Sequence, residues 1–161
     1  CAIEVRHRKP GTKLDNRKNG RYAGRVRLAV VFDRSAESLC GFVESAVAPG
    51  SLIVTDDWSG YAGLGKRGYE HFAVAECGDP EVAEQYLPII HLVFANLKTW
   101  LIGIHHGVSN QHLQAYLNEF TFRFNRRRSR SRGKLFFRLV QQAVAIDPAP
   151  YESLVRYARM P

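Results

Sequence analysis

Hydrophobic and polar residues follow a strand-like pattern in four short segments of the chain. Residues 1–8 (CAIEVRHR) alternate loosely, and residues 25–32 (RVRLAVVF) are rich in β-branched and apolar side chains, so both are predicted strands. Residues 9–24 between them are rich in Gly, Asn and Lys, which predicts a long hairpin loop. Residues 51–55 (SLIVT) predict a short buried strand, and residues 69–75 alternate in the manner of another strand.

Two segments carry apolar residues at helical spacing and have recognisable ends. The first helix follows Ser35, a candidate N-cap, and ends at Pro49-Gly50. Pro88 suits the first turn of a second helix, which is predicted to run to about Ile102 and to be followed by Gly103. The first helix lies between the second and third predicted strands, and the second helix follows the last one.

The C-terminal part of the sequence is predicted to be helical. Ser109 is a candidate N-cap for a helix over residues 110–125, and the weaker pattern of residues 135–161 predicts one or two short helices. The order strand, strand, helix, strand, strand, helices predicts an α/β fold with a mixed sheet flanked by helices. A chain of 161 residues with 45% hydrophobic residues is long and apolar enough for one domain with its own core.

The charge of the chain indicates a polyanionic partner. The formal net charge is +8 and the sequence pI is about 9.7, which favours nucleic acid or an anionic membrane surface. A basic run follows the predicted third helix and is either a DNA-phosphate patch or a solvated charged segment. Its arginines are Arg126, Arg127, Arg128, Arg130 and Arg132.

The sequence contains no pattern of a membrane or secreted protein. No apolar run reaches the roughly 18 residues of a membrane-spanning helix, and the first residues lack a signal-peptide pattern. Cys1, Cys40 and Cys77 are odd in number and far apart, so they predict neither a metal site nor a disulfide framework. A reducing cytoplasm suits this cysteine usage.

Only a few residues suggest chemistry before any family is considered. Asp56 stands where a predicted strand stops, a position where ligand sites of α/β sheets gather, although an Asp pair in a turn is the alternative. The neighbours His105 and His106 lie beside glycines and are predicted to form a turn, because adjacent residues diverge and no third ligand is evident. Trp58 and Trp100 either stack on nucleic-acid bases or pack in the core.

Three segments resemble the catalytic domain of DDE-type transposases of bacterial insertion sequences, which has an RNase H-like fold. Residues 50–61 (GSLIVTDDWSGY) resemble the second-aspartate motif, residues 91–109 (HLVFANLKTWLIGIHHGVS) the third-position helix, and residues 112–127 (HLQAYLNEFTFRFNRR) the segment that closes the domain. The resemblance implies a catalytic domain over residues 1–128, whereas the basic residues 129–161 are a diverged tail.

The resemblance also implies a reaction and its cofactor. Such enzymes hold two divalent ions, usually Mg²⁺ and alternatively Mn²⁺, for in-line phosphoryl transfer in DNA cleavage and strand transfer. Asp56 would be the second acidic ligand, and its neighbour Asp57 is the less favoured candidate. The implied partners are the insertion-sequence ends and the target DNA. The implied location is the bacterial cytoplasm at the nucleoid, and a homo-oligomer is expected to form on DNA.

Two positions depart from the family pattern. The leading aspartate of the family precedes the strand over residues 1–8, and neither Asp15 nor Asp33 matches it, so we expect a domain without its first strand. The third acidic position is not acidic, because His91 stands seven residues before Lys98, with Asn96 as the alternative. Seven residues at about 100° each return to one helix face, which favours His91 over Asn96.

These departures leave two functions open. The first is a transposase catalytic domain that does not cut or join DNA as this chain stands, because two-metal chemistry needs more carboxylates than the motifs supply. The alternative is a non-catalytic DNA-binding remnant of a transposase. Both predict DNA binding, and they differ in whether a complete carboxylate cluster exists.

Overall fold

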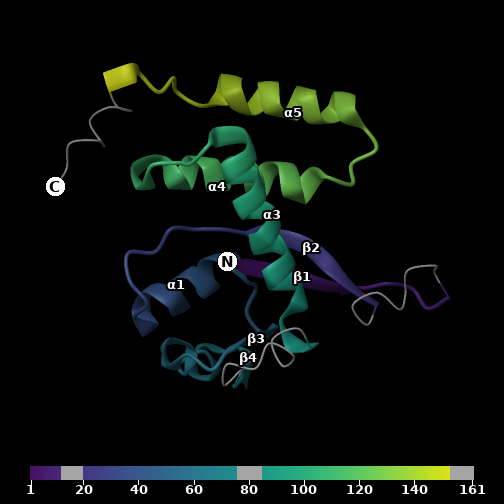
Figure 1. Ribbon diagram of the computed structural model, residues 1–161, viewed down its shortest axis with the longest axis vertical. Coiled ribbons are helices and arrows are strands. Elements are labelled where there is room, and N and C mark those ends of the chain that lie inside the picture. The colour runs from purple at the N-terminus through teal and green to yellow at the C-terminus, as the bar shows by residue number, and fades with distance from the viewer. Residues whose placement is uncertain (12–19, 76–84, 153–161) are drawn as a thin grey trace.

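The fold combines two small β-sheets with helices that cover them (Figure 1). Strand β1 (Ala2–His7) pairs antiparallel with β2 (Arg21–Arg27), and β3 (Leu52–Asp56) pairs in parallel with β4 (Glu70–Val74). The predicted α/β class is confirmed, but the described strands form two separate two-stranded sheets and not one mixed sheet. The computed structural model describes residues 1–11, 20–75 and 85–152.

Four α-helices of the described residues pack with these sheets. The prediction of Ser109 as the N-cap of a helix over residues 110–125 is wrong, because Ser109 precedes a 3₁₀ turn without a side-chain cap hydrogen bond and α4 begins at Leu113. Helix α3 crosses the β1–β2 pair, α4 lies beside it, and α5 is the outermost layer above α4 (Figure 1). None of the described helices is long and apolar enough to cross a membrane. The helices are α1 (Ala36–Ala46), α3 (Pro88–His105), α4 (Leu113–Arg126) and α5 (Arg132–Ala145), with short 3₁₀ helices η2 (Ser59–Tyr61), η3 (Gly65–Arg67) and η4 (Asn110–His112).

The helix ends show which local signals are used. Ser35 is the N-cap of α1 and accepts a hydrogen bond from the Ser38 amide, as predicted. Pro88 occupies the first turn of α3, also as predicted. The predicted stop at Gly103 is wrong, because α3 continues to His105 and ends at His106, which adopts a left-handed conformation with φ 52°. Gly103 is thus an interior helix residue.

The second strand begins and ends earlier than its apolar pattern predicts. The register places Arg21 opposite His7 and Arg27 opposite Ala2, so residues 28–32 extend beyond the strand pair. Their backbone is held instead by the Gln114 side chain, which accepts from the Val30 amide at 2.8 Å. The predicted strand over residues 25–32 is therefore wrong in its second half, because pairing with β1 and not β-propensity sets the bounds.

Strand β1 contains a bulge at Glu4, where a side-chain carboxylate accepts a backbone hydrogen bond. The register shifts between Ile3 and Val5, and the carboxylate of Glu4 accepts from the Arg25 amide at 2.9 Å. Glu4 also accepts from Nε of Arg6 at 2.7 Å, and these hydrogen bonds, first from Arg6 and then from Arg25, hold the pKa of Glu4 below its usual value. The side chain thus replaces part of the ladder at the bulge.

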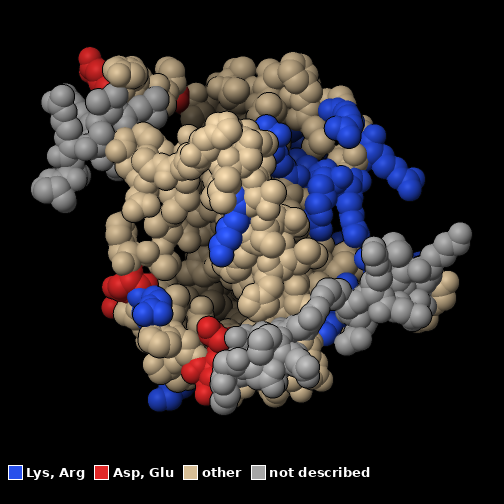
Figure 2. Space-filling model, viewed as in Figure 1, with Lys and Arg blue, Asp and Glu red and all other residues tan. Residues whose placement is uncertain are grey.

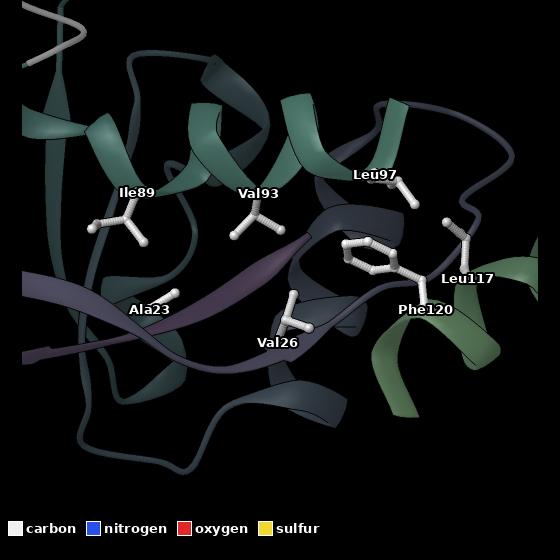
Figure 3. Packing of buried hydrophobic residues seen from close by; sticks show 7 residues of the cluster. All are labelled: Ala23, Val26, Ile89, Val93, Leu97, Leu117 and Phe120. Carbon is white, nitrogen blue, oxygen red and sulfur yellow. The ribbon is translucent and has the colours of Figure 1, made fainter. Parts of the chain in front are cut away.

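The main core lies between α3, β2 and α4. Ile89, Val93 and Leu97 form one stripe of α3 at a spacing of four residues, and they point toward β2 (Figure 3). Side chains of β2 and α4 complete the cluster: Ala23, Val26, Leu117 and Phe120. Val26 and Val93 are the most deeply buried, at 0% and 1% exposed.

A single side chain satisfies the backbone of the most buried strand residue. Asn125 on α4 accepts a hydrogen bond from the Val26 amide at 2.7 Å and donates one to the Val26 carbonyl at 3.0 Å. No other residue type of this size offers an acceptor and a donor in one flat group. Asn125 thereby joins the C-terminal turn of α4 to β2.

We expect Asn125→Ala to destabilise the fold markedly. It would leave two buried backbone groups of Val26 without partners, at roughly 1–3 kcal/mol for each group. Urea unfolding should show the lower midpoint. Asn96→Ala at an exposed position of α3 makes the same chemical change, is the matched control and should change stability by less than about 0.5 kcal/mol. Equal midpoints for the two variants would contradict the role given to Asn125.

A second, smaller core holds the β3–β4 sheet to α1. Cys40 and Val43 of α1 pack against Leu64 and Tyr69, which flank the 3₁₀ turn η3. The opposite face of this sheet is open, with Leu52 64% exposed and Phe72 51% exposed. The prediction that residues 51–55 form a buried strand is therefore wrong, because in the described structure only one face of β3 is covered.

Candidate active site at the end of strand β3

Asp56 is the last residue of β3 and its side chain is exposed to solvent. It lies at the final position of the parallel register, opposite Val74. The Thr55 hydroxyl donates to the Asp56 carbonyl at 2.6 Å and also lies 2.8 Å from Nε2 of His71 on β4. The neighbouring strand thus fixes the backbone that presents the Asp56 carboxylate.

The residues that follow Asp56 anchor the strand end to α1. Nε1 of Trp58 donates to the Arg34 carbonyl at 3.2 Å, and the Arg34 guanidinium lies 4.7 Å from the centre of the Trp58 ring. Gly60 is buried, and a Cβ atom there would lie 2.8 Å from Cδ1 of Leu39. The tryptophan and the glycine of the DDWSGY segment therefore have a structural role in holding this turn.

The charge of Asp56 affects the pKa of Tyr61. This pKa is raised above the ordinary tyrosine value, first by burial and then by the negative charge of Asp56. The shift places the Tyr61 hydroxyl within the electrostatic influence of the strand end. This is a neighbour of Asp56 that the sequence motif contains but that spacing alone did not single out.

His91 and Asn96, the two candidates for the third position, and the associated Lys98 all lie exposed on α3. At about 100° per residue, His91 and Lys98 share the side of the helix opposite to the buried stripe through Val93. Asn96 lies on a different side, roughly 60° from Val93. The shared face of His91 and Lys98 follows from the continuous helix, whereas their approach to Asp56 stays a prediction.

The described residues do not by themselves fit a two-metal centre. In residues 1–11, 20–75 and 85–152, no three His, Cys, Asp or Glu side chains gather where they could hold a metal ion. Asp56 and Asp57 offer carboxylate oxygens, which suit Mg²⁺, while the His91 imidazole suits softer ions. Two metals need several carboxylates, so further acidic ligands would have to join Asp56.

The paired histidines after α3 belong to packing and turn formation, as predicted. The His105 ring lies 4.7 Å from that of Trp100 and 4.6 Å from that of Tyr116, measured between ring centres. His106 is the left-handed residue that ends α3. Trp100 also packs 5.7 Å from Phe120, which confirms the core alternative for this tryptophan.

The basic run at the end of α4 divides into residues that hold the fold and residues that face outward. Arg127 donates to the carbonyls of Ala23 and Gly24, and burial, with the charge of Arg128, lowers its pKa. Arg126 lies over the Phe122 ring at 3.8 Å. Arg130 and Arg132 are exposed, as is Arg128.

The acidic strand end, the long helix α3 and the closing helix α4 follow one another in the order expected of a DDE-type transposase domain. The family model of the ISXO2-like transposase domain matches residues 4–125. This match spans most of the 161 residues, and the chain belongs to that family. No curated protein and no solved structure matches the chain.

Proposed function

We propose that this chain is the catalytic domain of a transposase that cleaves DNA at insertion-sequence ends and transfers the strands to a target. The observation that carries this proposal is the position of Asp56. It is the first of the two acidic residues of the DDWSGY segment, and it ends a parallel strand in a chain that matches the ISXO2-like family over residues 4–125. The ends of such strands are where α/β sheets present ligands for catalysis.

We further propose that the two sheets are halves of one RNase H-like mixed sheet. A strand that bears the leading aspartate would lie between β1 and β3. In the described part of the chain, β1 pairs only with β2 and β3 only with β4, so each has one edge without a neighbouring strand. Unpaired edges beside exposed apolar residues such as Val5 and Leu52 favour the addition of a strand.

In this proposal Asp56 holds a divalent ion together with further carboxylates. The described residues do not bring such carboxylates together. Asp57 is the less favoured candidate for the same ligand position as Asp56. His91 occupies the third catalytic position, with Lys98 seven residues after it, and Asn96 is the alternative for that position. Mg²⁺ or Mn²⁺ would supply the Lewis-acid chemistry of phosphoryl transfer. The 161-residue chain alone is accordingly expected not to cut or join DNA.

The second candidate function is a non-catalytic DNA-binding remnant of a transposase. His91 favours it, because an imidazole stands at the third position where the family commonly has a glutamate. Strand transfer separates the two functions. A chain extended at its N-terminus by an aspartate-bearing strand should join a labelled insertion-sequence end to target DNA if the first proposal holds, and should remain inactive if the second does.

The proposed setting is the bacterial cytoplasm, at the nucleoid, with a homo-oligomer that forms on DNA. This setting is inferred from the family, whose enzymes act on DNA ends, and from the net charge of +8. Arg126, Arg128, Arg130 and Arg132 are the proposed DNA-contacting arginines of the C-terminal run. Arg127, also predicted from the sequence, donates instead to backbone carbonyls of Ala23 and Gly24.

We expect the chain to bind duplex DNA with little sequence preference and with steep salt dependence. Each phosphate that an arginine neutralises should contribute about 0.9 to the slope of the log–log salt plot. Fluorescence anisotropy with random-sequence duplexes over a range of salt concentrations measures this slope. A flat plot, or no binding at low salt, would remove the support that charge gives to the proposal.

A further inference from the structure

Tyr22 lies at the centre of a group of arginines that come from distant parts of the chain. It is a residue of β2 and pairs with Arg6 of β1. The guanidinium carbon of Arg8 lies 5.3 Å from the centre of the Tyr22 ring, and that of Arg128 lies 4.3 Å from the same point. Arg8 directly follows β1, whereas Arg128 follows α4, so the tertiary structure brings these two cations to one ring.

One of the two arginines at Tyr22 has a hydrogen-bond donor without a partner. The Nε atom of Arg8 is buried and has no hydrogen-bond partner among the described residues. A buried donor without an acceptor is costly, and a bound anion would remove that cost.

The positive charge of the group is also unbalanced within the described part of the chain. The ion pairs there involve other arginines, namely Arg6 with Glu4, Arg67 with Glu44 and Arg123 with Glu119. Lysine and arginine side chains gather on the side of the molecule where the β1–β2 pair meets the end of α4 (Figures 1 and 2). Acidic side chains in this view lie elsewhere on the surface (Figure 2).

We propose that Arg8 and Arg128, which lie over the Tyr22 ring, form a cradle for the phosphates of duplex DNA. This inference rests on the proposed function and names the surface that holds the DNA backbone. A guanidinium offers a planar fork of donors that matches phosphate, and stacking on Tyr22 orders that fork before DNA arrives. The cradle therefore positions the duplex without reading its sequence.

This geometry gives different roles to two neighbouring arginines of the basic run at the end of α4. Arg127 donates to backbone carbonyls of β2, whereas its neighbour Arg128 lies over the Tyr22 ring and has no hydrogen bond to another residue that the structure describes. The run therefore contributes to DNA binding through Arg128 at the cradle, and Arg127 holds α4 against the strand that carries Tyr22. Arg8, which follows β1, completes a surface that no single segment of the sequence contains.

The test compares Arg8→Gln and Arg128→Gln with the unaltered chain in binding to a short random duplex. Each substitution should weaken binding roughly 3- to 10-fold at about 100 mM salt and should lower the salt slope by about 0.9. Tyr22→Phe should bind as the unaltered chain does, because it keeps the ring face, whereas Tyr22→Leu should weaken binding. Arg123→Gln, on α4 but paired with Glu119, is the matched control and should have a much smaller effect. Thermal unfolding by circular dichroism checks that each variant is folded.

The outcomes distinguish this inference from the proposed function. If the unaltered chain binds duplex DNA but Arg8→Gln and Arg128→Gln behave as Arg123→Gln does, the cradle is wrong and the proposed function stands. If the unaltered chain binds no duplex, both are overturned. If the two cradle variants lose binding to single-stranded RNA or inorganic phosphate but keep their affinity for the duplex, the assignment of the cradle to DNA is overturned.

Discussion

Asp56→Asn should abolish strand transfer while leaving DNA affinity unchanged. The substitution keeps the size of the side chain and removes the negative charge that would hold a divalent cation. The protein for this assay is the chain extended by an aspartate-bearing strand, with Mg²⁺ or Mn²⁺ present. A metal ion contributes several kcal/mol to phosphoryl transfer, and each 1.36 kcal/mol is tenfold in rate, so we expect a loss of at least about 100-fold.

Asp57→Asn in the same extended chain tests the less favoured of the two candidate ligands against Asp56. Asp57 is the adjacent carboxylate but follows the end of β3. We therefore expect the Asp57→Asn variant to retain most of the strand-transfer activity. Product formation is measured by gel electrophoresis of labelled DNA, and affinity by anisotropy. Equal losses in both variants would show that the pair acts together. Activity of the 161-residue chain alone that vanishes in Asp56→Asn would show that its own residues complete the carboxylate cluster.

Val93→Asp should prevent the domain from folding. Val93 is 1% exposed and lies at the centre of the stripe by which α3 packs on β2 (Figure 3). A carboxylate there would have no partner, and the cost of an unpaired buried charge is several kcal/mol. The whole free energy of unfolding of a domain is only about 5–15 kcal/mol. Far-UV circular dichroism and thermal unfolding should show loss of the cooperative transition.

Val144→Asp provides the comparison for this prediction. It makes the same chemical change on α5, where Val144 is 82% exposed, and should alter stability by less than about 0.5 kcal/mol. If Val93→Asp unfolds with the same midpoint as Val144→Asp, the packing of α3 on β2 is not the core of the domain.

Local patterns were sufficient wherever the physical cause is local. The N-cap at Ser35 and the first-turn position of Pro88 were predicted correctly, because capping and the fixed φ of proline depend on neighbouring residues. The stripe of Ile89, Val93 and Leu97 is equally a property of helical period. The motif around Asp56 also indicated the family, which the match over residues 4–125 confirmed.

Tertiary contacts decided what these patterns could not. Residues 28–32 have strand-like side chains, yet they are not a strand, because the register with β1 ends at Arg27. The Val30 amide donates a hydrogen bond to the side chain of Gln114, which lies far along the chain. The side chain of Asn125 accepts a hydrogen bond from the Val26 amide in the same way. A long-range hydrogen bond of this kind has no local sequence signal, since it depends on how α4 packs.

Composition indicated a polyanionic partner, but the sequence by itself placed the basic surface only in the run after α4. The arrangement of Arg8 and Arg128 on one Tyr22 ring arises because the strand pair and the end of α4 meet in space. Charge is a sum over the chain and can be counted from the residues. A binding surface depends on which of those charges the fold brings together and which, like that of Arg127, it uses to hold its own backbone.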